Sequence, residues 1–366
     1  MKVSVIIPTY NCEKFLDDSI GSLLKQTFTD FEIIVVDNKS EDKTVQKVKE
    51  FIEKDSRISV IELDENLKQG IARNIGVEHA KGEYIMFVDG DDRTAPDFIE
   101  KMYNKIVSDD ADMTICRWAP FDHFTGKINY KHGYANFHRL PEKYLKESFT
   151  WRDIKEEVYS QSNVPWDKIY KKSFLIDKEV KFPGGMFFED NVFSYDAIMK
   201  ADKITVLDEC LIYYRVNRKQ AVTARRDETF LDYLKIFEKI KENLVKQGYY
   251  EEMKYNFINY KVRSLFWWWK KIEFRLKKTF FEMIKEDYVE MYNTELATVN
   301  DKRNIWTKTF FLINRVLDNG FWTYLFFVYW DRIFRIEYGV DNHMIMLLSN
   351  YSFWYSNYDN KRLNFD

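Results

Sequence analysis

The sequence predicts an α/β protein that begins with a doubly wound sheet of parallel strands and ends in a helical region. Short β-branched runs alternate with segments of helical spacing over residues 1–107, which is typical of parallel sheets flanked by helices. After Asp227, charged and aromatic residues mix at helical spacing with few Gly or Pro, which predicts helices. We therefore predict two domains in the 366 residues, divided at residue 225.

Four apolar runs in the first ninety residues are typical of buried strands. Val3 to Ile7 is almost entirely β-branched or apolar and is followed at once by Pro8, which cannot donate to a sheet. The second and fourth runs end in carboxylates, Asp37 and Asp89. The segments between them carry apolar residues at helical spacing. We predict strands over residues 3–7, 31–36, 58–63 and 84–88, and helices over residues 13–25, 40–52, 69–80 and 96–107.

The middle of the chain has a mixed pattern, and its last part is helical. Pro183-Gly184-Gly185 predicts a turn before a helix that starts near Glu189. We predict strands over residues 113–116, 204–207 and 211–215, a hairpin over 123–134, and helices over 230–246, 251–284 and 306–330.

The bulk composition excludes several classes of protein. With 56 basic and 59 acidic residues, the chain lacks the basic excess of a nucleic-acid-binding protein. Its 3 cysteines are widely spaced, which favours free thiols in a reducing compartment over disulfides or a zinc site. No signal peptide is visible, and no run approaches the roughly 18 apolar residues of a spanning helix. We expect a cytoplasmic protein.

The acidic run Asp89-Gly90-Asp91-Asp92 is the strongest candidate for chemistry. Three carboxylates crowd together just past an apolar strand, where they repel one another unless a cation neutralises them. Carboxylate and phosphate oxygens suit Mg²⁺ or Mn²⁺. Thr9 and Asp37 also follow strands and should gather at the same sheet edge, where ligands of such sheets bind. The alternative interpretation is a solvated acidic turn.

Several segments taken together resemble the family 2 glycosyltransferases. The opening strand with Pro-Thr-Tyr-Asn, the strand ending in Asp37, the Gly-x-Ala-Arg-Asn-x-Gly segment, the Asp-x-Asp motif and the Glu-Asp-x-x-Phe motif follow the family's order. The resemblance covers about residues 1–220. These segments are Val3 to Asn11, Ile33 to Asp42, Gly70 to Gly76, Phe87 to Asp92 and Phe188 to Phe193.

The resemblance implies a GT-A fold, with a Rossmann-like mixed sheet flanked by helices, and an inverting hexosyl transfer from a nucleotide-diphosphate-sugar, usually UDP-linked. We accordingly predict a transferase domain over 1–225, with nucleotide-sugar binding in 1–110 and the acceptor side in 111–225, and an aromatic-rich helical domain over 226–366. In the family, the counterpart of Asp37 accepts a hydrogen bond from uracil, and the counterpart of Asp91 ligates Mn²⁺ or Mg²⁺. The implied nucleotide-sugar residues are Pro8, Thr9, Asn11, Asp37, Arg73 and Asp89, and Asp89 is also a candidate metal ligand.

The same resemblance makes Asp190 the candidate general base, with Glu189 as a supporting group. Inversion needs a carboxylate that takes the proton of the acceptor hydroxyl. Two acids at a helix start are equally explained by the helix dipole. Some relatives supply a downstream histidine to the metal, but none occurs here between His138 and His343. We predict that Trp166, Arg215 and Arg218 lie on the acceptor side. A position in the core is the alternative for Trp166, and contact with the diphosphate is the alternative for the two arginines.

The aromatic and basic stretches 266–271 and 326–335 fit an interfacial helix on the inner face of the cell membrane. A helical core and a homo-oligomer interface are the alternatives. We expect the acceptor to be a glycan or lipid-linked hydroxyl in the synthesis of bacterial surface polysaccharide, such as capsule, or glycolipid. A nucleotidyltransferase is disfavoured, because the loop after the first strand has neither a Gly-rich turn nor a lysine. A non-catalytic sugar-nucleotide-binding or scaffold protein is disfavoured by the presence of both Asp91 and Asp190.

Overall fold

The computed structural model describes residues 1–130, 137, 139–218 and 225–303, together with 305, 313, 314, 316, 317, 320 and 321. Contacts between Cα atoms divide the chain into two compact units, Met1–Glu273 and Phe274–Asp366. Most of the predicted helix over 306–330, and the end of the predicted hairpin beyond residue 130, lie outside the described residues.

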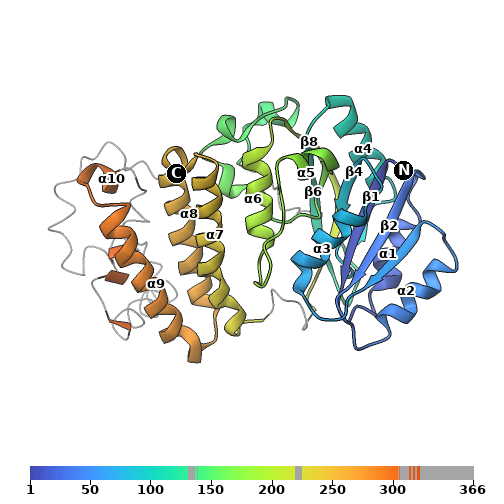
Figure 1. The fold of residues 1–366 in the computed structure, drawn as a ribbon, viewed down its shortest axis with the longest axis horizontal. Helices are drawn as coiled ribbons and strands as arrows, with labels where there is room; N and C mark the ends of the chain where they lie inside the picture. The colour runs from blue at the N-terminus through green and yellow to red at the C-terminus, as the bar shows by residue number, and fades with distance from the viewer. Residues whose placement is uncertain are drawn as a thin grey trace. The chain divides into compact units, whose positions relative to one another are not determined.

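Four parallel strands form one half of an eight-stranded sheet, as the strand–helix alternation predicted (Figure 1). The two strands at the centre of this half are buried along their whole length, which explains why their sequences are mainly apolar and do not alternate. In the order in which they lie side by side, the strands are β3 (Ile58–Glu62), β2 (Phe31–Asp37), β1 (Val3–Thr9) and β4 (Tyr84–Phe87).

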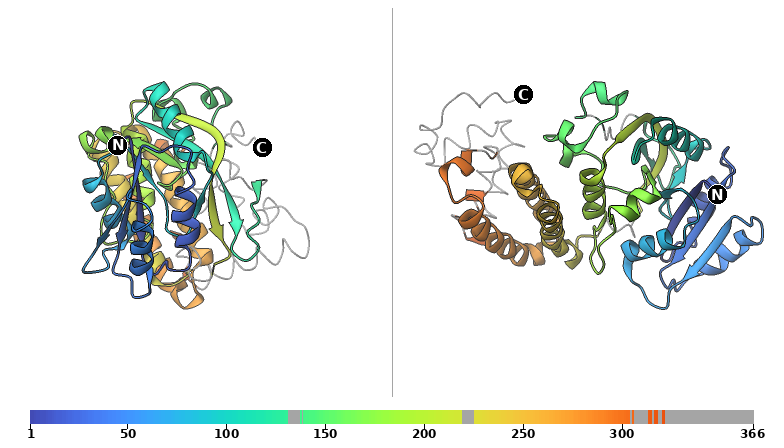
Figure 2. Two further views of the ribbon diagram at one scale, coloured as in Figure 1. Left: turned by 90° about the vertical axis from the view of Figure 1, so that its right-hand side faces the viewer. Right: turned by 45° about the horizontal axis from the view of Figure 1, so that its top comes forward.

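The other half makes the sheet mixed, as the family resemblance implied. β7 pairs antiparallel with both β4 and β6, and β8 pairs parallel with β6 and antiparallel with β5. The two strands predicted over 204–215 are one long strand that lies beside β6, with a register shift near Cys116 (Figure 2). These strands are β7 (Lys168–Lys171), β6 (Met113–Asp122), β8 (Ile204–Val216) and β5 (Arg93–Thr94).

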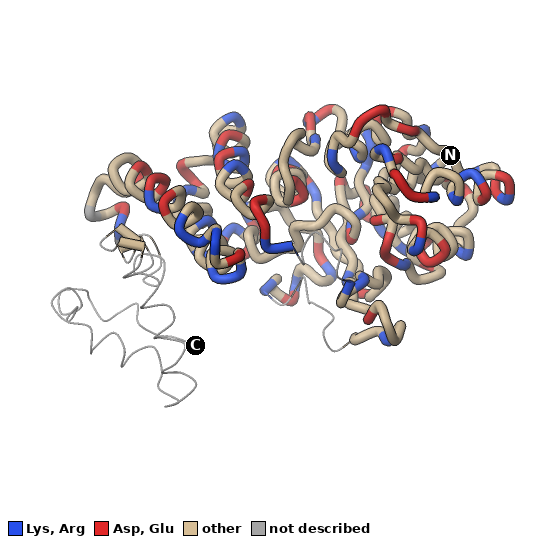
Figure 3. The backbone as a smooth tube through the Cα atoms, turned by 90° about the horizontal axis from the view of Figure 1, so that it is seen from below, with Lys and Arg blue, Asp and Glu red and all other residues tan. Residues whose placement is uncertain are grey.

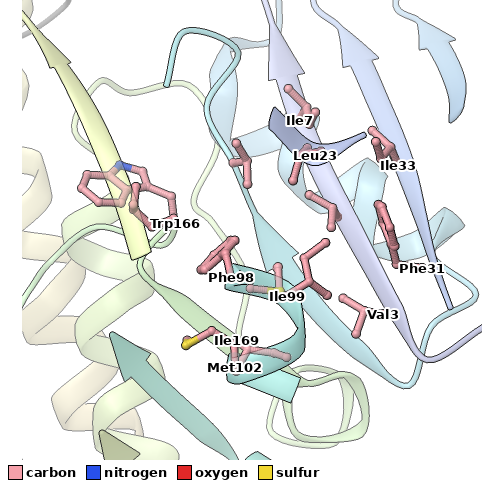
Figure 4. Packing of buried hydrophobic residues seen from close by; sticks show 14 of the residues in the cluster. Val3, Ile7, Leu23, Phe31, Ile33, Phe98, Ile99, Met102, Trp166 and Ile169 are labelled. Carbon is pink, nitrogen blue, oxygen red and sulfur yellow. The ribbon is translucent and has the colours of Figure 1, made fainter. Parts of the chain in front are cut away.

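Helices cover both faces of this sheet. Side chains of alternate strand residues, such as Val3 and Ile33, pack with Leu23, Phe98 and Ile99 in one apolar core (Figure 4). The opposite strand face, which carries Ile6, packs closely against the helix that contains Gly76. The helices of this part are α1 (Leu16–Leu23), α2 (Thr44–Ile52), α3 (Lys68–His79), α4 (Phe98–Asp109) and α5 (Lys172–Asp177).

Three further helices of the first unit, α6 (Asp190–Lys200), α7 (Asp232–Lys246) and α8 (Tyr250–Lys271), lie side by side (Figure 1). The prediction of one helix over 251–284 is wrong, because α8 ends at Lys271 and the backbone of Ile272 is extended, with φ −59° and ψ 152°. The second unit contains α9 (Phe274–Thr294) and α10 (Val299–Arg303). Short 3-10 turns cover Glu142–Leu145, Trp151–Ile154, Val158–Ser160 and Glu228–Leu231.

Basic and acidic residues are interspersed along the described chain, in keeping with its near-zero net charge (Figure 3). Within the part of the chain that the structure describes, no helix is both long and apolar enough to cross a membrane.

Candidate active site at the carboxyl ends of the strands

The carboxyl ends of β1 and β2 bring the predicted nucleoside-binding residues together. Thr9 lies opposite Asp37 in the parallel register, and its hydroxyl donates a 2.9 Å hydrogen bond to Asp37 Oδ1. The backbone N–H and the hydroxyl of Ser40 also donate to Asp37, at 2.8 and 2.6 Å. Asp37 is only 2% exposed, so these three donors replace the water that its carboxylate has lost.

The loop that follows β1 is tied to the loop that follows β2. Asn11 has a φ of 51°, a left-handed conformation that asparagine adopts more readily than most residues. Its backbone N–H donates to the Ser40 hydroxyl at 2.9 Å, and its side-chain oxygen accepts from the Glu41 N–H at 2.8 Å. Pro8 is buried in β1. The two predicted nucleotide-binding segments therefore form one edge.

Three carboxylates cluster after β4. One ligand atom from each of Asp89, Asp91 and Asp92 lies within 4.8 Å of the others. Asp92 is 1% exposed, and its Oδ2 atom is buried without a hydrogen-bond partner. Burial and the neighbouring carboxylates raise the pKa of Asp92 well above its ordinary value, and burial raises the pKa of Asp91. An orphaned carboxylate oxygen among hard oxygen ligands fits a divalent cation. From the sequence we placed Asp92 in the carboxylate cluster but named only Asp89 and Asp91 as candidate ligands, and the geometry adds Asp92 as a further candidate.

Two arginines, one near the end of β8 and one just after it, lie at this cluster. Arg218 forms a 2.6 Å ion pair with Asp91 Oδ2. Arg215 donates from its backbone N–H to Asp92 and from Nε to the backbone carbonyl of Asp91, at 2.8 and 2.6 Å, and it pairs with Asp18. Both arginines thus lie at the carboxylate cluster, and their role toward an acceptor stays a prediction.

Arg73 joins the carboxylate cluster to the candidate base. Its side chain is 0% exposed on α3, and one guanidinium donates from Nη2 to Asp89 at 2.8 Å and from Nη1 to Asp190 at 2.7 Å. Nη1 also reaches Glu189 Oε1 at 3.3 Å. The planar fork of arginine suits such a bridge, because its donors point in fixed and different directions.

Asp190 is the first residue of α6, and its side chain remains 25% exposed. Burial raises the pKa of Asp190 to about 8, against the attraction of Arg73. Glu189 is 6% exposed, and burial likewise raises the pKa of its carboxyl group. A partly exposed carboxylate with a raised pKa is suited to accept a proton near neutral pH.

Gly70 lets α3 approach the segment that carries these acids. A Cβ atom at this position would lie 2.7 Å from Glu189 Cγ, 3.0 Å from Phe182 Cβ and 3.2 Å from the Pro183 carbonyl oxygen. The glycine of the Gly-x-Ala-Arg segment thus leaves the room that the contact between Arg73 and the two acids requires.

Trp166 lies in the apolar core (Figure 4), 4% exposed. Its ring stacks on Tyr214, with centroids 5.6 Å apart, and meets the edge of Trp118 at 5.3 Å. This packing agrees with the core position that we gave as the alternative. The role of Trp166 toward an acceptor stays a prediction.

Comparison with known proteins identifies the fold of this chain. The model of the family "Glycosyl transferase family 2" matches residues 4–168. The crystal structure of Staphylococcus aureus TarS residues 1–349 in complex with UDP-GlcNAc superimposes with a TM-score of 0.69 at 22% identity, covering 88% of this chain and 89% of that one. The fold is therefore a GT-A fold with C-terminal helices.

Curated relatives define the family. Glycosyltransferase GlyG of Streptococcus pneumoniae serotype 4 is 30% identical over 215 residues, which cover 58% of this chain and 70% of GlyG. The chain belongs to the family 2 glycosyltransferases. It spans only 31% of the length of glycosyltransferase GlyA of the same organism, with 31% identity over 59% of the chain. It spans 36% of the poly(ribitol-phosphate) beta-N-acetylglucosaminyltransferase TarS of S. aureus, with 32% identity over 60% of the chain.

Proposed function

We propose that this glycosyltransferase moves a sugar from a UDP-sugar to a hydroxyl of a glycan or lipid-linked acceptor, with inversion, in the synthesis of a bacterial surface polysaccharide or glycolipid. The observation that carries the proposal is the Arg73 bridge, which holds a strand-end carboxylate and the candidate base Asp190 on one guanidinium. The crystal structure of the relative TarS with UDP-GlcNAc supports a UDP-linked donor.

At the donor end, Asp91, Asp89 and Asp92 are the residues that would hold Mn²⁺ or Mg²⁺. When bound there, such a cation would neutralise charge on the diphosphate and make it a better leaving group. Arg218 and Arg215 bring further positive charge to the same place. The three acids would repel the negative charge of a diphosphate, so the two arginines and a bound cation would together make the site favourable for it.

At the nucleoside end, the edge formed by Pro8, Thr9, Asn11 and Asp37 would hold the base and ribose. Asp37 Oδ2 accepts one hydrogen bond, from the Ser40 N–H at 2.8 Å, and so keeps a lone pair for a donor on the uracil ring. The contacts with Thr9 and Ser40 fix the orientation of this carboxylate before a nucleotide arrives.

At the acceptor end, Asp190 would take the proton of the acceptor hydroxyl while that oxygen attacks the anomeric carbon and the UDP departs from the opposite face. Arg73 orients Asp190 through the 2.7 Å hydrogen bond and keeps its carboxylate charge paired until the proton moves. Glu189, held by the same guanidinium, supports this position.

A donor screen by thermal unfolding tests the proposal. With Mn²⁺ present, we expect UDP and one or a few UDP-sugars to raise the melting temperature, while GDP-mannose and ATP do not. Ligand stabilisation of this kind follows mass action, so it should disappear with chelator and in the Asp91→Asn variant. Stabilisation by UDP that persists unchanged in chelator would contradict the metal site, and selective stabilisation by ATP would favour a nucleotidyltransferase. The anomeric configuration of the product, read by NMR, tests inversion.

We also propose that residues 226–366 act as a helical domain with peripheral contact to the inner face of the cell membrane. The basic side chains Lys270 and Lys271 at the aromatic end of α8 support this contact. Lys271 Nζ lies 3.3 Å from the ring centroid of Trp267. Flotation with anionic liposomes tests it, and failure to float would remove the membrane from the proposal.

A further inference from the structure

Phe188, which directly precedes the two acids of the site, has an unfavourable backbone conformation. Its φ is 64°, in the left-handed region that bulky residues seldom adopt. This turn directs the chain into α6, because the Phe188 carbonyl accepts hydrogen bonds from the backbone and the side chain of Asn191 at 3.2 and 3.0 Å. Strained residues of this kind persist only where the surrounding structure holds them, and they concentrate at functional sites.

Three aromatic rings from a later part of the chain hold the Phe188 side chain. Its ring stacks on Tyr233 with centroids 4.5 Å apart and lies 5.3 Å from Phe230 and 5.9 Å from Trp268. We call these three rings the Phe188 cage. They come from the 3-10 turn before α7, from α7 itself and from α8. The first turn of α7 adds a polar contact, since Asp232 Oδ2 accepts from the Phe187 N–H at 3.0 Å.

A second connection joins α8 to the residue that follows the acids. The Tyr260 hydroxyl donates to Asn191 Oδ1 at 3.1 Å, and Asn163 Nδ2 donates to the same oxygen at 2.6 Å. The Tyr260 ring is itself fixed, because it stacks on Tyr159 at a centroid distance of 4.7 Å and an interplanar angle of 3°. Thus α7 and α8 hold the chain on both sides of the acids.

We infer that α7 and α8 are part of the catalytic apparatus, and that the Phe188 cage and Tyr260 are positioning residues for Asp190. This inference rests on the proposed function of Asp190 as the base. Without the cage, Phe188 relaxes toward a negative φ, which rotates the next peptide groups and moves the carboxylate of Asp190 away from Arg73 and the acceptor. The donor edge at β1, β2 and β4 makes none of these contacts, so the loss should fall on turnover and not on nucleotide affinity.

The test separates these two readouts. In Trp268→Leu we expect kcat for UDP release from the UDP-sugar selected by the donor screen to fall by about tenfold or more, because small misplacements of a reacting group are costly. The Kd of UDP with Mn²⁺, measured by calorimetry, should stay within about twofold in the same variant. Trp268→Phe, which keeps a ring in the cage, should recover most of kcat. Tyr260→Phe should lower kcat by a few-fold, whereas the matched control Tyr255→Phe on the same helix should not.

Two kinetic outcomes overturn the inference: kcat of Trp268→Leu equal to that of the wild type, or a loss of UDP affinity as large as the loss of kcat. Hydrogen–deuterium exchange at the amides of residues 186–192 gives a readout that needs no substrate. Exchange there should increase in Trp268→Leu and stay at the wild-type level in Tyr255→Phe, and equal exchange in both variants overturns the inference. If the wild type binds no UDP, the proposed function fails, while the exchange result still decides the positioning.

Discussion

Replacing Arg73 with methionine removes the charge that holds the two ends of the site together. The variant keeps most of the aliphatic volume of the side chain but leaves three carboxylates without their shared cation. Those carboxylates, on Asp89, Glu189 and Asp190, are only 17%, 7% and 25% exposed. Breaking a buried ion pair by removing one partner costs about 3–5 kcal/mol, because the remaining charge is desolvated and unpaired. At roughly 2–4 °C per kcal/mol, the melting temperature should fall by about 6–20 °C.

The loss of stability in Arg73→Met should depend on pH, and the sign of this dependence follows from the carboxyl groups that remain. Burial raises the pKa of Glu189 and of Asp190 even beside Arg73. A carboxyl group whose folded-state pKa lies above its unfolded-state value contributes stability at low pH, and that contribution is lost as the pH rises toward the folded-state pKa. Without the arginine these pKa values rise further. The free energy of unfolding that Arg73→Met loses relative to the wild type should therefore be small near pH 5 and largest at pH 8 and above.

Thermal unfolding of both proteins at pH 5 and pH 8 measures this effect. Arg57→Met is the matched control, because Arg57 pairs with one carboxylate, Asp55, at 2.7 Å, and its own side chain is 26% exposed, against 0% for Arg73. Surface ion pairs contribute about 0–1 kcal/mol, so this control should lose little stability. The reasoning is refuted if Arg73→Met loses no more stability at pH 8 than Arg57→Met, or if its deficit is the same at both pH values.

Three other changes have definite expected outcomes. Gly70→Ala places a Cβ 2.7 Å from Glu189 Cγ, so we expect about 1–3 kcal/mol less stability in thermal unfolding and slower UDP release. Wild-type stability and a wild-type rate would show that the Glu189 side chain moves aside without cost. Because a base must be deprotonated and the pKa of Asp190 is raised to about 8, kcat/KM should rise from pH 5 to about 8, and a flat profile would count against this base. Asp91→Asn should weaken Mn²⁺-dependent UDP binding by about tenfold or more in calorimetry, with unchanged affinity excluding Asp91 as a ligand.

The sequence predicted the first half of the sheet because its two central strands are buried along their whole length and carboxylates follow the apolar runs of β2 and β4. Asp37 is the last residue of β2 and Asp89 follows β4, and the structure places both at one edge, whereas β1 continues two residues past its predicted end, through Pro8 to Thr9. The strand β7 escaped prediction because Lys168–Lys171 begins and ends with lysine. Lys168 is 0% exposed and pairs with Asp167 at 2.6 Å, a tertiary environment that no local pattern reveals. The end of α8 at Lys271 also lacks any Gly or Pro signal.

The members of the candidate site were found by motif, but their connections were not. Arg73 and Asp190 are separated by 117 positions, and only the fold shows that one guanidinium reaches both Asp190 and Asp89. Asp92 was not named as a candidate ligand because its distinguishing property is a buried oxygen without a hydrogen-bond partner, which depends on the strands packed around it. The Phe188 cage likewise depends on a backbone angle and on three distant rings.

Asp190→Asn provides the sharpest test of the proposed transfer, because the amide keeps the size of the side chain and removes its ability to take a proton. The rate of UDP release from the selected UDP-sugar and acceptor should fall by about 10²–10⁴-fold, the usual contribution of general base catalysis. The affinity for UDP with Mn²⁺ should be unchanged, since Asp190 lies across Arg73 from the carboxylate cluster. Turnover at the wild-type rate in this variant would contradict Asp190 as the base and the mechanism proposed around it.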